Sequence, residues 1–250
     1  MKKLIVIVAL LSVFGAGWAS EPMADAPDST THTEQSSRLR HFGFGLTAGQ
    51  DRNYHVVDMS YMSDMEYTKY EEGYSIGGQI TYRPVRWVSL RIEAVLLQKN
   101  YRMDHVKQLQ SVRYYTYTLT ENRYVNVPLT LALHMGKTVR VSLFGGVYGG
   151  YWLTSHRSGE SLSLSSRVYG DEEVNAFDED VVFDERRDNR EDAGFVWGAG
   201  VSAMLFRQLE LGADVRWYYG VYDIQKEYQR GLNPRYNTTM VMQAGLTYWL

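Results

Sequence analysis

The feature that most constrains this chain is a two-residue alternation of apolar and polar side chains, which recurs between residues 41 and 250. In LELGADVRWYYGV (209–221), one face carries Leu, Ala, Val, Trp and Tyr, and the other carries Glu, Asp, Arg, Tyr and glycine. A period of two is typical of a β-strand whose two faces meet different surroundings. Seven further stretches repeat the pattern: 41–49, 74–83, 88–96, 125–133, 139–153, 195–205 and 240–250. The sequence therefore predicts eight β-strands.

The connections between these strands alternate in length. The short ones are 84–87, 134–137 and 206–208. The long ones are 50–73, 100–118, 154–193 and 222–237. Transmembrane β-barrels combine short periplasmic turns with long extracellular loops. The predicted fold is thus all-β: an eight-stranded antiparallel transmembrane β-barrel with four long extracellular loops and three short periplasmic turns.

The composition of the two strand faces indicates which face meets lipid. The apolar faces end in aromatic residues on both sides, as expected of the aromatic girdles at the two membrane interfaces. The polar faces consist mostly of Gly, Ser, Thr and Ala. Such residues would solvate a soluble, lipocalin-like barrel poorly, but they would fit a narrow lumen. We therefore expect the apolar face to contact outer-membrane lipid and the polar face to line the lumen.

The N-terminal residues indicate export from the cytoplasm. A basic start (MKK) precedes a short apolar run and small residues, which predicts a signal peptide over 1–19. The alternative, an uncleaved anchor helix, requires a longer apolar run. Residues 20–40 are rich in Ser, Thr, Asp and Pro, which predicts a disordered periplasmic linker. The barrel domain then spans 41–250, in the cell outer membrane, where the barrel assembly machinery would fold it.

Composition excludes several other classes of protein. The chain has no Cys, so the exported fold forms without disulfides and without lipid attachment at a cysteine. Its net charge of −3 argues against binding nucleic acid. We predict no cofactor, because no phosphate-binding glycine loop, zinc cluster or redox pair occurs in the sequence.

Charged residues interrupt the small side chains of the predicted lumen face, where a charge is costly unless it is paired. They are Arg91, Glu93, Arg140, Glu210, Asp214 and Arg216. The strands 88–96 and 209–221 face each other across an eight-stranded ring. Arg91 is therefore expected to meet Asp214, and Glu93 to meet Arg216, with Arg140 and Glu210 nearer the periplasmic rim.

This predicted charge network is interpreted as a structural plug of the lumen. The alternative, a proton or ion path, needs an opening that eight strands hardly leave. A general diffusion porin is excluded for the same reason.

The connection 154–193 is strongly acidic. Its segment DEEVNAFDEDVVFDERRDNRED has eleven acidic and three basic residues. A run of charge usually forms a solvated surface. Asp178, Glu179 and Asp180 could also bind Ca²⁺ or Mg²⁺, since these cations prefer oxygen ligands, although the spacing matches no EF-hand loop. Docking of a basic partner is a third interpretation.

A short motif raises the possibility of enzymatic activity. In SHRSGES (155–161), His156 and Ser158 lie two positions apart, with Glu160 close by. The spacing resembles the His-x-Ser motif of outer-membrane lipid A deacylases. A serine nucleophile needs a base and an orienting acid within hydrogen-bond reach. The side-chain parity points inward or into a loop, whereas a lipid substrate arrives from outside, so we predict that the protein is not an enzyme.

Five motifs together resemble the PorT-like outer-membrane β-barrel proteins of Bacteroidota. They are SLRIEAVLLQKNY, YVNVPLTLAL, FGGVYGGYWL, DAGFVWGAG and LGADVRWYYGV. The resemblance implies an eight-stranded outer-membrane barrel. Because the namesake of the family is associated with the type IX secretion system, it also implies a role in protein secretion, with other secretion-system or envelope proteins as partners. The alternatives are a surface adhesion or ligand-binding barrel that acts through the acidic loop 154–193, and a lipid-modifying enzyme.

Overall fold

The computed structural model describes residues 40–57, 65–109, 112–164, 172–226 and 235–250. The predicted signal peptide lies outside these residues, as does the predicted linker apart from Arg40. The described residues form β1 (Phe42–Val57), β2 (Met65–Val85), β3 (Val88–Gln98), β4 (Tyr101–Leu109), β5 (Val112–Met135), β6 (Val139–Leu164), β7 (Glu172–Asp180), β8 (Glu191–Met204), β9 (Leu209–Gly220) and β10 (Arg235–Trp249). None of them belongs to a helix long and apolar enough to cross a membrane.

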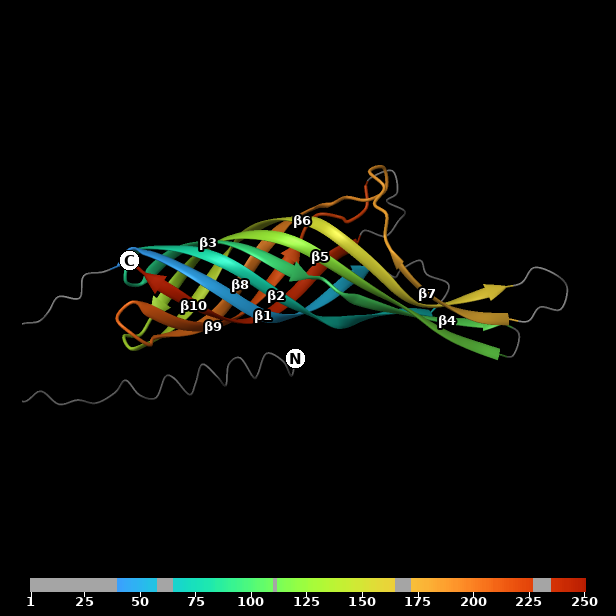
Figure 1. The fold of residues 1–250 in the computed structure, drawn as a ribbon, viewed down its shortest axis with the longest axis horizontal. Coiled ribbons are helices and arrows are strands. Elements are labelled where there is room, and N and C mark those ends of the chain that lie inside the picture. The colour runs from blue at the N-terminus through green and yellow to red at the C-terminus, as the bar shows by residue number, and fades with distance from the viewer. Residues whose placement is uncertain (1–39, 58–64, 110–111, 165–171, 227–234) are drawn as a thin grey trace, which may run out of the picture. The chain divides into compact units, whose positions relative to one another are not determined.

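Eight of these strands close into a ring (Figure 1), in the order β1–β2–β3–β5–β6–β8–β9–β10. Neighbouring strands are antiparallel, and the ring closes where β10 pairs with β1 along its length. After a break at Lys99 and Asn100, β4 continues β3 between β2 and β5. β7 pairs with the outer part of β6. The predicted eight-stranded antiparallel transmembrane barrel is confirmed.

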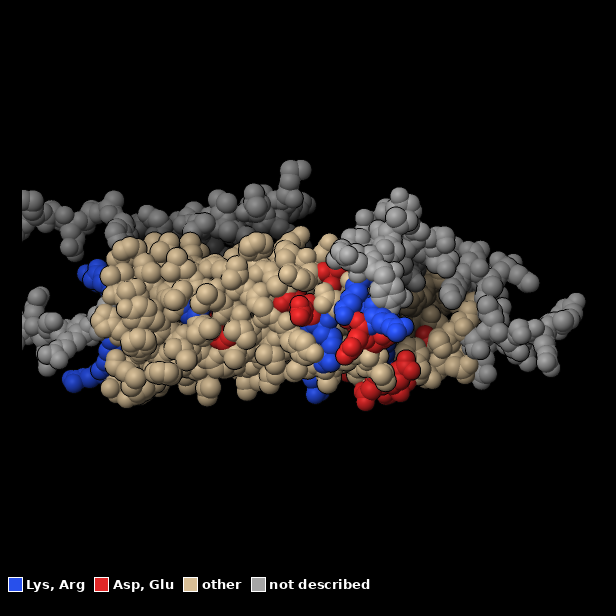
Figure 2. All heavy atoms as spheres, turned by 90° about the horizontal axis from the view of Figure 1, so that it is seen from above, with Lys and Arg blue, Asp and Glu red and all other residues tan. Residues whose placement is uncertain are grey.

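The two faces of the ring differ as the alternation predicts. On the outer face, Leu46 is 72% exposed and Leu131 is 54% exposed, whereas their neighbours Thr47 and Thr130 are buried in the lumen. Figure 2 shows few charged atoms on the outer face over the barrel. Exposed aromatic residues mark its two ends: Phe42, Phe44, Tyr82 and Tyr248 at one, and Tyr74, Tyr151, Phe195, Trp197 and Tyr219 at the other. This arrangement is an apolar wall between two aromatic bands, as a bilayer requires.

Tight turns join the strands at the periplasmic end of the barrel. They occupy 86–87, 136–138 and 205–208. Gly136 has a φ of +106°, and a Cβ there would lie 2.1 Å from the carbonyl oxygen of Val139. Only glycine takes up this left-handed conformation at no steric cost, so the turn between β5 and β6 depends on it.

At the opposite end, the strands continue much further than the sequence predicts. β5 begins at Val112 and β6 ends at Leu164, both inside segments predicted to be loops. With β4 and β7 they form two ribbons, β4–β5 and β6–β7, which β5–β6 pairs join as far as Thr118 and Gly159. Figure 1 shows the ribbons beyond the end of the ring. The predicted loop boundaries are wrong because the prediction assigns a segment to a strand only where one of its faces is apolar. A β-ladder needs only backbone hydrogen bonds, and both faces can be polar outside the bilayer.

Candidate functional site in the barrel lumen

A layer of paired charges crosses the lumen between β3 and β9. Arg216 donates from Nη1 to Glu93 Oε2 over 2.7 Å, and its Nε and Nη2 donate to the Asp214 carboxylate at 2.9 Å each. Arg91 Nη1 lies 3.4 Å from a Glu93 oxygen and 3.5 Å from an Asp214 oxygen. The Arg216 and Glu93 side chains are 0% and 1% exposed. Their charges are therefore balanced by one another, since water does not reach them.

A glycine makes room for an aromatic ring within this layer. Phe144 on β6, Gly198 on β8 and Arg216 on β9 are neighbours across three strands. A Cβ at Gly198 would lie 2.6 Å from the Phe144 ring. Without that Cβ, the ring centre lies 5.3 Å from the guanidinium carbon of Arg216 and 5.7 Å from that of Arg91. These distances allow cation–π attraction to both cations, so the glycines on the polar face reflect a crowded lumen.

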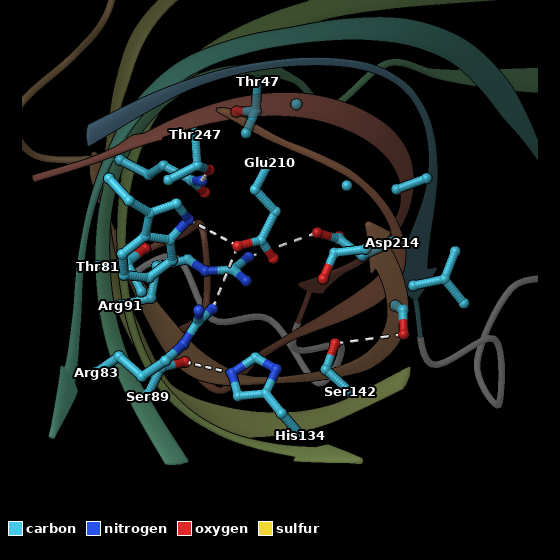
Figure 3. A pocket seen from close by; sticks show the side chains of 18 residues that line it. Thr47, Thr81, Arg83, Ser89, Arg91, His134, Ser142, Glu210, Asp214 and Thr247 are labelled. Carbon is cyan, nitrogen blue, oxygen red and sulfur yellow. Dashed lines mark hydrogen bonds and ion pairs between the residues drawn. The ribbon is translucent and has the colours of Figure 1, made fainter. Parts of the chain in front are cut away.

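A second charged layer lies nearer the periplasmic turns (Figure 3), with Glu210 at its centre. Glu210 Oε2 accepts a hydrogen bond from the Trp249 indole over 2.7 Å and lies 2.7 Å from Arg140 Nη2. The same oxygen is 3.4 Å from Arg83 Nη2. The Arg83 guanidinium also stacks on Trp249, 3.9 Å from the ring centre. One carboxylate thus faces two guanidinium groups.

A third layer lies on the extracellular side of the central charges. It begins with a buried apolar cluster: Val95, Leu97, Tyr148, Val196, Tyr218 and Val241. Beyond it, Lys99 and Asp192 form an ion pair whose side chains are 0% and 4% exposed. The Tyr148 hydroxyl donates to Asp192 Oδ1 over 3.2 Å, and the Lys99 ammonium lies 4.6 Å from the centre of the Tyr124 ring. Apolar and charged side chains therefore follow one another along the lumen.

The structure brings the six predicted lumen charges together in the central and periplasmic layers. The sequence prediction omits five buried acidic or basic residues: Asp51, Arg83, Lys99, Asp192 and Asp223. A signal for Lys99 and Asp192 exists, because the inward parity of 88–96 continues to Lys99 and that of 195–205 continues back to Asp192. Both positions are missed because the prediction ends each strand at the bilayer. Arg83 is missed because it occupies the last inward position before a turn.

The acidic segment does not bring the three predicted cation ligands together. Along β7, Asp178 and Asp180 lie on one face, and Glu179 lies on the other, opposite Arg157. His156 on β6 takes the place of a cation: its Nε2 is 2.9 Å from Asp178 Oδ1, and its Nδ1 is 2.9 Å from Asp180 Oδ1. Within the described ranges, no group of three or more His, Cys, Asp or Glu is placed to hold a metal ion.

The same contacts bear on the His-x-Ser motif at 156–158. Both ring nitrogens of His156 face carboxylates, so neither is left to accept the proton of Ser158, as a general base must. Glu160 lies opposite Ala176, further along the ribbon. The three residues of the motif therefore do not form a nucleophile, base and orienting acid.

The His156 contacts predict a pH dependence of the β6–β7 ribbon, which lies beyond the aromatic band. The hydrogen bond to Asp180 and the charge of Asp178 raise the pKa of His156 above 6.5. Because the pKa is raised, the contact is fully present below the ordinary histidine pKa and is lost as the pH rises through the raised value. An NMR titration of His156 should give a pKa above 6.5, and Asp180→Asn should lower it. An unchanged pKa in that variant would contradict the contact.

A family model described as "Outer membrane protein beta-barrel domain" matches residues 33–226 of this chain. Among curated proteins, none matches the sequence. Solved structures that are 11% identical have a similar fold. The match to Neisserial surface protein A covers 84% of this chain and 97% of that protein's chain, with a TM-score of 0.43. The attachment invasion locus protein Ail of Yersinia pestis covers 84% and 100%, with a TM-score of 0.38. The outer membrane protein AlkL covers 92% and 97%, with a TM-score of 0.40. Similarity at this level carries no argument about function.

Proposed function

Because this chain belongs to the outer membrane protein β-barrel domain family, we propose that it is a non-enzymatic, non-conducting outer-membrane barrel that acts by binding other proteins. The observation that carries the proposal is the filled lumen. Two charged layers, an apolar cluster and the Lys99–Asp192 pair follow one another along its axis. A barrel filled in this way offers its partners the surfaces outside the bilayer.

The resemblance to PorT-like barrels supports one class of partner, the components of a type IX secretion system. In this role the barrel holds a secretion component at the outer membrane. Deletion of the gene should then reduce secreted cargo, as seen by comparing the secretomes of deletion and parent strains. Affinity capture from detergent-solubilised membranes should recover secretion components with the barrel. An unchanged secretome together with capture of no such component would reject this role.

The two extracellular ribbons favour a second candidate, a surface adhesion or ligand-binding barrel. The two strands of each ribbon are paired residue by residue. A ribbon can therefore be shortened without changing the register of the pairs that remain. In β6–β7, the pair Arg157–Glu179 could be joined by Asn-Gly in place of 158–178. In β4–β5, the pair Asp104–Tyr117 could be joined in the same way in place of 105–116. Loss of surface binding in the first variant, with binding retained in the second, would assign adhesion to the acidic ribbon.

A non-conducting barrel makes a direct electrical prediction. In planar bilayers, the purified protein should show no stable conductance, because ions would have to cross the apolar cluster and break buried ion pairs. A porin of known conductance, reconstituted in the same bilayers, is the positive control. Large, long-lived channels from the wild-type protein would contradict the proposed function.

A further inference from the structure

The periplasmic layer of the lumen encloses a cavity of about 50 Å³. Its polar lining includes Arg83, Ser89, His134, Glu210 and Thr247, several of which Figure 3 shows pointing toward one another. A cavity that holds a single water molecule has a volume on the order of 10–15 Å³. The cavity, called the periplasmic chamber below, therefore has room for a small ion with some water.

The charges of the periplasmic layer do not balance. Among the described residues, Arg83 and Arg140 share the single carboxylate of Glu210. In the next layer, Arg91 and Arg216 face two carboxylates, so that layer is neutral. The periplasmic layer thus carries one positive charge in excess.

Several buried nitrogen atoms at the chamber also have no hydrogen-bond partner among the described residues. The Arg83 side chain is 7% exposed, and its contact with Glu210 is long, at 3.4 Å. Its Nε has no hydrogen-bond partner within the described part of the chain; the same holds for Arg140 Nε, which belongs to the same layer but does not line the chamber. His134 Nε2 is engaged with Ser89 Oγ at 2.7 Å, whereas Nδ1 is without a described partner. Buried groups of this kind are normally satisfied, and guanidinium N–H groups are satisfied best by an anion.

We propose that the periplasmic chamber binds a small monovalent inorganic anion such as chloride, held chiefly by Arg83. The ion supplies the missing negative charge and accepts hydrogen bonds from the unpaired donors. Glu210 competes with it for the Arg83 guanidinium. The central charged layer closes the chamber above, so the ion binds from the periplasm and does not pass through.

The surroundings of the chamber favour entry of an anion. Each described turn at this end carries one exposed cation, Arg86, Lys137 or Arg207, and none carries an Asp or Glu. Figure 2 shows Lys and Arg, without Asp or Glu, at this end of the described chain on the face in view. A rim of one sign raises the local concentration of the opposite ion.

Chloride itself is the probe for the experiment. Chloride is titrated against gluconate at constant ionic strength, with the unfolding midpoint and the line width of the chloride NMR signal as readouts. The wild-type midpoint should rise with chloride and not with gluconate, which is too large for the chamber. Arg83→Met should weaken chloride binding roughly tenfold, as loss of one charge-assisted contact predicts. Arg52→Met, which removes an exposed arginine near the extracellular end of β1, should leave binding unchanged.

A second variant keeps the test decisive if Arg83→Met does not fold. Glu210→Gln removes the competing carboxylate and should tighten chloride binding, the opposite direction to Arg83→Met. The chloride affinity of each variant is measured in its own titration. A difference in stability without chloride therefore does not affect the comparison of affinities. Equal responses to chloride and gluconate in the wild type, or equal chloride affinity in wild type and Glu210→Gln, would overturn the anion site and leave water as the occupant.

Discussion

Arg216→Met is expected to destabilise the barrel by about 3–5 kcal/mol, the range measured when one member of a buried ion pair is removed. The variant leaves Glu93 and Asp214 in the lumen with Arg91 as their remaining described cation, at 3.4 Å and 3.5 Å. Two carboxylates that share one guanidinium lack a full counter-charge, and the Glu93 side chain is 1% exposed. Denaturant unfolding in lipid vesicles would measure the loss, with folded protein detected by its faster migration on unheated gels.

Two companion variants test the pairing itself. Glu93→Gln should cost less than Arg216→Met, because Arg216 keeps both of its 2.9 Å bonds to Asp214. Combining Glu93→Gln with Arg216→Met should recover part of the loss, since the uncompensated carboxylate is removed. Arg86→Met, in an exposed turn, is the matched control and should change stability little. A double variant no more stable than Arg216→Met would show that the two residues are not coupled.

The second large effect is expected on the lipid face. Val201 lies within β8 and is 51% exposed on the outer face. Val201→Arg should cost about 2–4 kcal/mol, because a guanidinium group would have to enter the hydrocarbon region. Met135→Arg, next to the turn at Gly136, should cost only about 0–1 kcal/mol, because the charge can reach the interface.

The same vesicle assay measures both lipid-face variants. Val201→Lys should behave like Val201→Arg, whereas Val201→Leu should be nearly neutral, which separates charge from side-chain volume. Equal tolerance of arginine at residues 201 and 135 would mean that the lumen and lipid faces have been exchanged.

The barrel and its inner charges could be predicted from the sequence because both follow from side-chain parity. Once the apolar face is turned toward lipid, alternation alone directs Glu93 and Arg216 into the lumen, and an eight-stranded ring sets their strands opposite each other. Parity also extends to Lys99 and Asp192, but only if the strands are allowed to leave the bilayer. An apolar face is required by lipid and not by a β-ladder, so the ribbons carry no comparable hydrophobic signal.

Other features of the site depend on three-dimensional detail that a one-dimensional pattern does not contain. Parity places Arg83, Arg140 and Glu210 on the lumen face, but it does not specify that two arginines share one carboxylate. That ratio depends on the tilt of β2, β6 and β9 and on the stacking of Arg83 against Trp249. The contacts of His156 likewise depend on β7, a strand inside a segment predicted to be a loop.

The pair between Glu93 and Arg216 has a consequence for how the barrel enters the membrane. It joins residues 123 positions apart in the chain, on strands that meet only after the sheet has curled upon itself. Contacts between such distant residues form late in folding. Until then, Arg216 has only Asp214 and Glu93 has only Arg91 beside it on its own strand, and exposing these incompletely paired groups to hydrocarbon is costly. Curling of the sheet and transfer into the bilayer must therefore be concerted, so that a flat, inserted sheet is never a stable intermediate.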